Sequence, residues 1–236
     1  MDCLPEKTGV FVIQEPWGSE MKSHFKILLQ KMSWKILGTK ILIVVSLAMA
    51  QQKGLAQNNS YVESIKAYQS SYVNNHEVVK PPDRKFIRFY PISSAYRVKA
   101  NFRRIIDRRG FYMVTATGVH QKFYKYGLLS FRVKGVPAHL YVYQSDDLLK
   151  QPKLKDYLFV PFGDATSGVT SYGGGRYLDF RVSDIKNGIL WIDFNKAYNP
   201  YCAYTTGYDC PLPPKENLLS LPIRAGEENY GKPVHH

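Results

Sequence analysis

The chain has 236 residues, of which 44% are hydrophobic and 22% are charged, and these ordinary globular values exclude a wholly disordered polymer. Its length accommodates one domain with appendages rather than several large domains. The formal net charge of +13 favours anionic neighbours, which concerns association rather than fold.

The N-terminal segment predicts export. Lys35 and Lys40 precede an apolar run, residues 41–50, that ends in small side chains. This pattern indicates a secretory signal peptide with cleavage after Ala50 or Ala56. The alternative is a membrane anchor, but the run is shorter than the roughly 20 residues that span a bilayer. We therefore expect a periplasmic or secreted protein with no stable membrane span after cleavage.

The region before the signal is too long for the short charged segment that normally opens a signal peptide. Met21 and Met32 both offer alternative starts, and Met32 gives the more conventional signal. We divide the chain into a leader from a wrongly assigned start (1–31), a signal peptide (32–56), a single domain (57–230) and a tail (231–236). Removing residues 1–50 takes away six basic and four acidic residues and leaves a net charge of +11.

A helix is predicted directly after the signal. Ser60 and Glu63 have the spacing of a capping box. One helical stripe then carries Tyr61, Ile65, Tyr68 and Tyr72. We expect this helix to end near residues 74–75 and to pack its tyrosine face on the domain; the alternative is a partner-binding helix.

From residue 86 onward the hydrophobic period becomes two, which predicts half-buried strands. The expected strands are 96–102, 111–117, 127–133, 138–142, 157–162, 176–182, 189–194 and 218–223. Asn187 and Gly188 suit positive φ and predict a hairpin between the 176–182 and 189–194 strands, and Pro222 places the last strand at an edge. The fold class is mainly β: an antiparallel sandwich or partly closed barrel of about seven or eight strands with one N-terminal amphipathic helix.

A glycine-rich loop at residues 173–176 is the first candidate site. It lacks the Lys-Ser/Thr of a phosphate loop and precedes a strand, so no nucleotide fingerprint applies. Bare backbone amides beside Arg176 nevertheless suit a carboxylate, phosphate or sulfate. The alternative is a tight turn in which Arg176 pairs with Asp164 or Asp179.

Several carboxylates are candidates for acid–base chemistry, because two carboxyl groups with separated pKa values can hydrolyse a bond. They are Asp164, Asp179, Asp193 and Glu216. Turn capping is the alternative role for Asp164.

A second candidate loop covers residues 198–214. Asn195 and Asn199 can hold turns at its start, and prolines stiffen its end. Cys202 and Cys210 predict a disulfide in an oxidising compartment, worth roughly 2–3 kcal/mol, with half of a metal site as the alternative. The loop is either a preorganised site wall or a stapled surface loop.

Other chemistries have little support in the sequence. There is no Gly-x-Ser-x-Gly, and the histidines show no recurring ligand spacing, so we expect no nucleophile, metal or cofactor. The arginines at 103–104 and 108–109 can touch a polyanion or lie in a solvated turn. No RNA-binding aromatic motif accompanies them, which argues against nucleic acid.

The chain resembles domain-of-unknown-function family 1684 over residues 60–230. The resemblance is carried by the runs LFVPFGDATSGVTSYGGGRYLDF, DFNKAYNPYCAYTTGYDCPLPPKENLLSLPIRAGE and YGLLSF. It implies an exported bacterial member of a bacterial and archaeal homology group, without implying an activity. It places the polar motif positions at Asp164, Thr166, Gly174, Gly175, Arg176, Asp193, Asn195, Asn199, Cys202, Cys210, Glu216, Asn217 and Glu227.

We expect a domain that binds an anionic small ligand or cell-envelope component through the 173–176 and 198–214 loops. The ligand-binding candidates are Asp164, Thr166, Gly174, Gly175, Arg176, Asp193, Asn195, Asn199, Glu216 and Asn217. The alternative is a hydrolase-like enzyme on an anionic or glycan substrate, with Arg176 as anion clamp and Asp164 or Asp193 as base. A split-barrel cofactor binder is permitted by the strand pattern and supported by no motif.

Overall fold

The computed structural model describes residues 24, 26, 49 and 57–232, and residues 57–232 form the folded domain. The predicted leader and signal peptide, and residues 233–236 of the predicted tail, lie almost wholly outside the described residues. Within the described part, no helix is long and apolar enough to cross a membrane.

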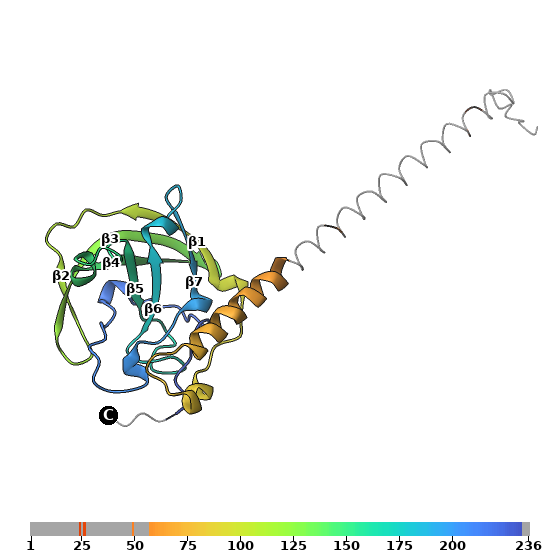
Figure 1. Ribbon diagram of the computed structural model, residues 1–236. Coiled ribbons are helices and arrows are strands. Elements are labelled where there is room, and N and C mark those ends of the chain that lie inside the picture. Colours follow the sequence, from red (N-terminus) through yellow and green to blue (C-terminus); the bar gives the residue numbers. More distant parts are fainter. Residues whose placement is uncertain (1–23, 25, 27–48, 50–56, 233–236) are drawn as a thin grey trace, which may run out of the picture. The chain divides into compact units, whose positions relative to one another are not determined.

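The domain is mainly β, as predicted: seven strands form one antiparallel sheet that curls into a half-barrel (Figure 1). The strands are β1 (Arg97–Arg104), β2 (Phe111–Val114), β3 (His120–Val133), β4 (Val136–Ser145), β5 (Tyr157–Phe162), β6 (Arg176–Arg181) and β7 (Ile189–Asp193). The helices are an N-terminal one at residues 57–74, α2 (Asp146–Leu149), and the 3-10 turns η1 (Pro81–Phe86), η2 (Ser94–Tyr96), η3 (Val182–Asp184), η4 (Phe194–Lys196), η5 (Tyr201–Ala203) and η6 (Lys215–Asn217).

The sheet has the strand order β6-β5-β4-β3-β1-β7, with β2 also paired to β3. The long strand β3 pairs with β2 along its first part and with β1 along its second. Its pairing to β4 shifts register between Lys125 and Gly127. A Cβ at Gly127 would lie 2.1 Å from the Phe102 ring, so glycine is required where that ring crosses the strand. This irregularity bends β3 between its two partners.

The concave side of the sheet is closed by alternating apolar residues. Val98 lies opposite Ile192, and Ala100 lies opposite Leu190, and all four side chains are buried in the main core. A second buried cluster contains Met113, Phe123, Tyr143, Phe159 and Tyr177. This second cluster fixes Tyr177 at the wall of the cavity described below.

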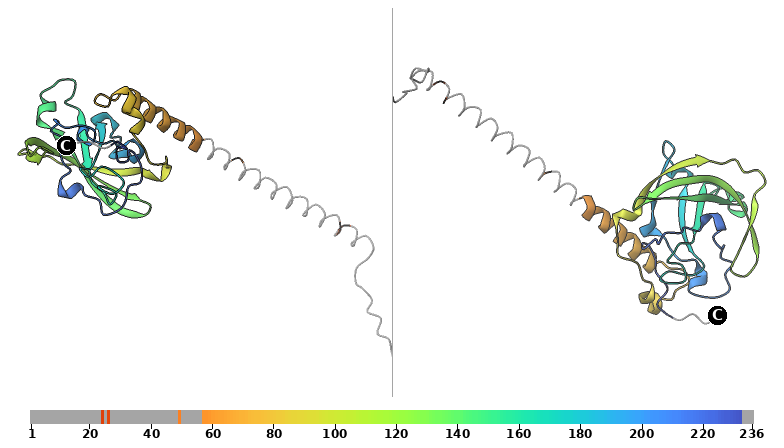
Figure 2. Two further views of the ribbon diagram at one scale, coloured as in Figure 1. Left: turned by 90° about the horizontal axis from the view of Figure 1, so that it is seen from below. Right: turned by 180° about the vertical axis from the view of Figure 1, so that it is seen from behind.

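The N-terminal helix packs on the domain beside β6 and β7 (Figure 2). Ile65 is buried, and the Tyr61 hydroxyl donates to Asp193 at 3.0 Å, so the predicted stripe faces the protein. The helix ends at residue 74, as predicted, but Ser60 already lies inside helix that extends from residue 57. The capping box at Ser60 and Glu63 is therefore wrong, because an N-cap residue stands outside the helix.

The hairpin predicted around Asn187 and Gly188 is half correct. These residues have φ of +51° and +72° and form a tight turn closed by Lys186 and Ile189. However, β6 pairs with β5 and β7 pairs with β1, so the two strands are the outer strands of the sheet and do not pair with each other. The η3 turn separates them, and the apolar residues of β7 are matched to those of β1.

The strand predicted at residues 218–223 is wrong. Leu218 makes only an isolated parallel bridge to Gly163. The Ile223 amide donates to Asp164 Oδ1 at 3.1 Å, and the Ile223 carbonyl accepts from Arg176 at 2.7 Å. The side chains of Asp164 and Arg176 therefore satisfy the backbone of Ile223, while Leu219 and Leu221 bond the backbone of residues 163 and 165.

Candidate functional site

Arg176 is fully buried and is the centre of a hydrogen-bonded cluster. Its Nη2 donates to Asp164 Oδ2 at 2.8 Å and to the Ile223 carbonyl at 2.7 Å, and its Nη1 donates to the carbonyls of Ala225 and Glu227 at 2.5 and 3.1 Å. Only Nε lacks a partner among the described residues. The four terminal N–H groups are used inside the protein, which favours the structural pairing with Asp164 over an anion clamp.

Asp164 completes this cluster from the loop after β5. Its Oδ1 accepts from the Thr166 amide at 2.8 Å and the Thr166 hydroxyl at 2.7 Å. The Thr166 hydroxyl also bonds Ser171 at 2.8 Å, and all three side chains are buried. Asp164 therefore caps its own turn while it neutralises Arg176.

Gly175 lets the glycine-rich loop (residues 173–176) pack closely against the second candidate loop (residues 198–214). Its φ is +83°, and a Cβ there would lie 2.5 Å from the Pro213 ring and 2.7 Å from the Phe162 carbonyl. Gly174 would similarly meet the Tyr172 ring at 2.5 Å. These glycines permit close packing of the loop against its neighbours.

Asp193 and Asn195 hold the N-terminal helix. Asp193 accepts from the Tyr61 hydroxyl and from the Asn195 amide at 3.1 Å. Asn195 in turn bonds the backbone of Ser93 in both directions, at 3.0 and 2.9 Å. The pair therefore connects the end of β7, the helix and the segment before β1.

Glu216 and Asn217 act at another place, beside β4. Asn217 donates to the carbonyls of Tyr141 and Pro161 and accepts from the Tyr141 amide at 2.7 Å. It thus bridges β4 and β5, which share a single paired position. Glu216 forms an ion pair with Lys125 at 2.8 Å.

Glu227 is a completely buried carboxyl in a tyrosine network. It accepts from the hydroxyls of Tyr72 (3.1 Å) and Tyr204 and from the Asn199 amide at 2.9 Å. The two hydroxyl oxygens also lie 3.0 Å from each other, within hydrogen-bond distance. Desolvation raises the pKa of Glu227 to about 7 in spite of these donors and the nearby Arg176.

The residues predicted to bind ligand therefore fall into separate structural clusters. One cluster consists of Asp164, Thr166 and Arg176. A second contains Asp193 and Asn195, which hold the N-terminal helix. Asn199 belongs to a third, where its amide donates to Glu227. Asn217 and Glu216 sit beside β4. Four of them, Asp193, Asn195, Asn199 and Asn217, hydrogen-bond segments that lie far apart in the chain.

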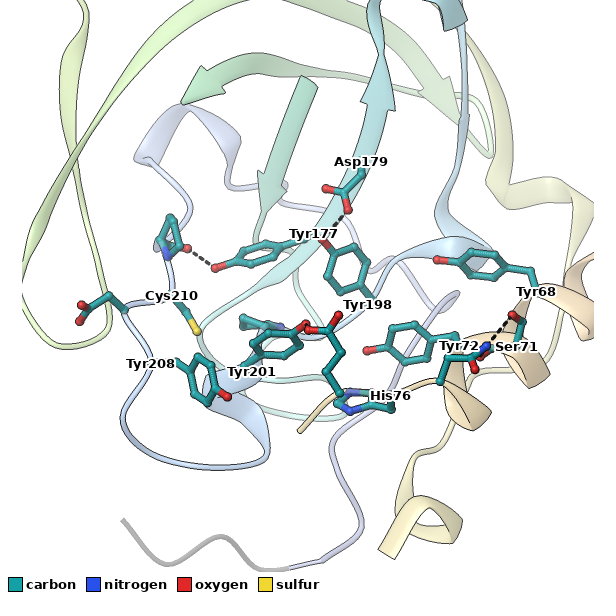
Figure 3. Close-up of a pocket in the computed structure, with 15 residues that line it drawn as sticks. Tyr68, Ser71, Tyr72, His76, Tyr177, Asp179, Tyr198, Tyr201, Tyr208 and Cys210 are labelled. Carbon is teal, nitrogen blue, oxygen red and sulfur yellow. Dashed lines mark hydrogen bonds between the residues drawn. The ribbon is translucent and has the colours of Figure 1, made fainter. Parts of the chain in front are cut away.

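A cavity of about 650 Å³ opens elsewhere, between the end of the N-terminal helix, strand β6 and the 198–211 part of the second candidate loop (Figure 3). Tyrosine is its dominant side chain, at Tyr68, Tyr72, Tyr177, Tyr198, Tyr201 and Tyr208. The predicted second loop thus forms a wall of a cavity, whereas residues 173–176 do not line it.

Sequence reasoning missed most of this lining. The stripe with Tyr68 and Tyr72 was expected to pack, and His76 was counted among scattered histidines. Asp179 was considered only as a partner for Arg176 or as an acid–base group. The sequence feature that could have indicated the cavity is the high frequency of tyrosine in both the helix and residues 198–208. No short motif links these two segments.

Burial shifts the pKa values of three side chains that line the cavity, Asp179, His76 and Tyr68. Asp179 accepts from the Tyr198 hydroxyl at 2.6 Å, and desolvation by the surrounding walls raises its pKa although its side chain is open to the cavity. Burial, with Arg84 nearby, lowers the pKa of His76 to about 4. Burial and three carboxylates raise the pKa of Tyr68 to about 12. At neutral pH the imidazole of His76 and the phenol of Tyr68 are therefore uncharged.

The cysteine pair holds the cavity wall. The sulfurs of Cys202 and Cys210 are within disulfide distance, with Cα atoms 6.3 Å apart, and Cys210 lines the cavity. The Tyr177 hydroxyl donates to the Pro211 carbonyl at 2.6 Å, which ties the same loop to β6. No group of three or more potential metal ligands occurs among the residues that the structure describes.

Residues 84–228 match the family described as "Protein of unknown function (DUF1684)". The solution NMR structure of an uncharacterized protein from gene locus rrnAC0354 of Haloarcula marismortui is 27% identical, with a TM-score of 0.55, over 73% of this chain and 96% of that chain. No curated protein matches the chain. The match begins at residue 84, so the N-terminal helix and its share of the cavity lie outside it. The chain belongs to the DUF1684 family of proteins of unknown function.

Proposed function

We propose that the domain is a binding module that takes a small ligand in the tyrosine-lined cavity. The observation that carries this proposal is the cavity itself: about 650 Å³, walled by six tyrosines from three separate segments. Concave sites of this size with aromatic walls and a few polar groups are typical of small-molecule binding.

Of the two loops predicted to bind ligand, this proposal retains residues 198–214 and excludes residues 173–176. The 198–214 loop supplies Tyr198, Tyr201 and Tyr208 to the cavity. The four terminal N–H groups of Arg176 are donated to buried protein acceptors and its Nε is buried, so the side chain is not placed to clamp an anion. For the same reason the geometry gives no support to a hydrolase that uses Arg176 with Asp164 or Asp193.

Tyr208 gives the sharpest test of the cavity. It is 39% exposed and contacts Tyr201 at 5.0 Å between ring centroids, so its removal spares the core. We expect Tyr208→Ala to weaken binding about tenfold, because a lost aromatic contact is worth about 1.4 kcal/mol. The measurement is thermal stabilisation by choline, glucosamine, glucose, glucuronate and phosphate, followed by calorimetry of the compounds that bind.

The matched control is Tyr112→Ala, which removes a 65% exposed tyrosine of β2 outside the cavity. It should leave the affinity unchanged. If Tyr112→Ala and Tyr208→Ala weaken binding equally, or if none of the five compounds stabilises the protein at millimolar concentration, the cavity is not the binding site.

We also propose that the domain works outside the cytoplasm. Support comes from the predicted signal peptide at 32–56 and from a cysteine pair at disulfide distance. N-terminal sequencing of the protein from a bacterial periplasm or culture medium should begin at Gln51 or Gln57. Recovery of cytoplasmic protein that retains residues before Gln51 would contradict export.

A further inference from the structure

The cavity differs in charge from the rest of the chain. Its lining includes the carboxylates Glu77, Asp179 and Asp209 and no lysine or arginine, although the chain carries a net charge of +13. Arg181 lies near enough to lower the pKa of Asp179, but its guanidinium is paired with Asp156 at 2.7 Å. The potential inside the cavity therefore favours a positive group.

The hydrogen-bond inventory of the wall points in the same direction. Tyr68 donates to the Lys196 carbonyl at 3.2 Å, Tyr177 to the Pro211 carbonyl, and Tyr198 to Asp179. Tyr72 and Tyr201 donate to Glu227 and Glu77. Five of the six tyrosine hydrogens are thus used within the protein, and the wall offers mainly acceptors and ring faces.

The ring faces are arranged around the cavity at different angles (Figure 3). Tyr201 and Tyr208 meet at 69°, Tyr177 and Tyr198 meet at 89° with centroids 5.8 Å apart, and Tyr72 lies 6.0 Å from Tyr198. Aromatic faces attract cations, most strongly where water is excluded. A sugar, in contrast, needs donors as well as acceptors from its site.

Among the residues that line the cavity, His76 has a buried donor without a partner. It is 5% exposed and borders the cavity, and its Nδ1 accepts from the Val79 amide at 3.1 Å. The neutral ring therefore carries its hydrogen on Nε2, which has no partner among the described residues. An oxygen on the ligand would satisfy this donor.

We propose that the cavity binds a small amino compound: a protonated amine or quaternary ammonium group held by Asp179 and the tyrosine faces, with an oxygen acceptor that meets His76. This inference rests on the proposed binding function and specifies its ligand class. It replaces the anionic ligand expected from the net charge of the chain.

The test compares ligands that differ only in charge. Choline is paired with its carbon isostere 3,3-dimethylbutan-1-ol, and glucosamine with glucose, while glucuronate represents anions. Calorimetry at low salt should show at least one cation binding tenfold or more tighter than its neutral partner. Asp179→Asn should abolish this preference, and Asp147→Asn, which removes an exposed carboxylate outside the cavity, should preserve it.

The outcomes separate the two proposals. Suppose that glucose, the neutral alcohol or glucuronate binds as tightly as the cations, and that Tyr208→Ala weakens this binding. That result would overturn the proposal of a cationic ligand and would leave the cavity as the binding site. An equal effect of Asp147→Asn and Asp179→Asn would also overturn the role of Asp179. The absence of binding by every compound would contradict both proposals.

Discussion

Replacing Arg176 by alanine is expected to destabilise the domain by about 3–5 kcal/mol, because it leaves a buried carboxylate without its partner. The side chain of Asp164 is 0% exposed, and three carbonyls of residues 223–227 lose their donors as well. For a chain of this size the melting temperature should fall by about 6–20 °C. Thermal and urea unfolding monitored by circular dichroism measure the change.

Two further variants keep this prediction testable if the single variant does not fold. Arg181→Ala removes an arginine of the same strand whose pair with Asp156 is 41% and 47% exposed, and it should cost less than about 1 kcal/mol. The double change Arg176→Met with Asp164→Asn removes both charges and should recover about 1–3 kcal/mol. If Arg176→Ala were no more harmful than Arg181→Ala, Arg176 would be free for a ligand and the structural assignment would fail.

Glu227→Gln is expected to change how stability depends on pH. The pKa of Glu227 is raised from 4.5 to about 7 by desolvation, so the folded protein binds more protons than the unfolded chain between these values. Stability from this group is therefore fully present below about pH 4.5 and is lost as pH rises through 7, a loss of about 3 kcal/mol. Glutamine imitates the protonated carboxyl and removes this loss.

The tyrosine network can accept the amide. Its Nε2 would donate to Tyr204, Tyr204 to Tyr72, and Tyr72 to the amide oxygen, so only the bond to Tyr204 reverses direction and no hydrogen bond is lost. Between pH 4 and pH 8, the free energy of unfolding of Glu227→Gln should rise by about 3 kcal/mol relative to the natural protein. Urea unfolding at each pH gives this difference.

Glu227→Gln must be compared with the natural protein because His76 changes the pH dependence of stability in the opposite direction. Its pKa is lowered from 6.5 to about 4, so its contribution to stability rises with pH over part of the same range. It cancels in the difference between Glu227→Gln and the natural protein. The exposed variant Glu63→Gln should show no such pH dependence, and a pH-independent difference for Glu227→Gln as well would mean that Glu227 titrates normally.

The sheet was largely predictable from the sequence because alternation reports which face is buried. Val98 and Ala100 alternate with charged residues, and β1 lies where this pattern predicts it. Pairing was not predictable at the ends of the sheet. Asn187 and Gly188 form the expected turn, yet β7 pairs with β1, far earlier in the chain. Residues 218–223 show the same limit, since at Ile223 the side chains of Asp164 and Arg176 stand in for a strand partner.

The candidate site was harder to predict because its walls come from distant segments. The helix meets the C-terminal region through Tyr72 and Glu227, and the end of β7 through Tyr61 and Asp193. Polar residues such as Arg176 stand out in the sequence, and the structure uses them to join segments. Tyr208 is not among the polar motif positions of the family, and it reaches the cavity in the loop between Cys202 and Cys210.

Chemical-shift mapping tests the central claim most directly. The protein is labelled on tyrosine rings and backbone amides and titrated with choline and glucosamine. We expect ring signals of Tyr201 and Tyr208 to move in a saturable way, while the amides of Gly174 and Gly175 and the ring of Tyr112 stay in place. Saturable shifts centred on the 173–176 loop, with the cavity tyrosines unchanged, would contradict the account.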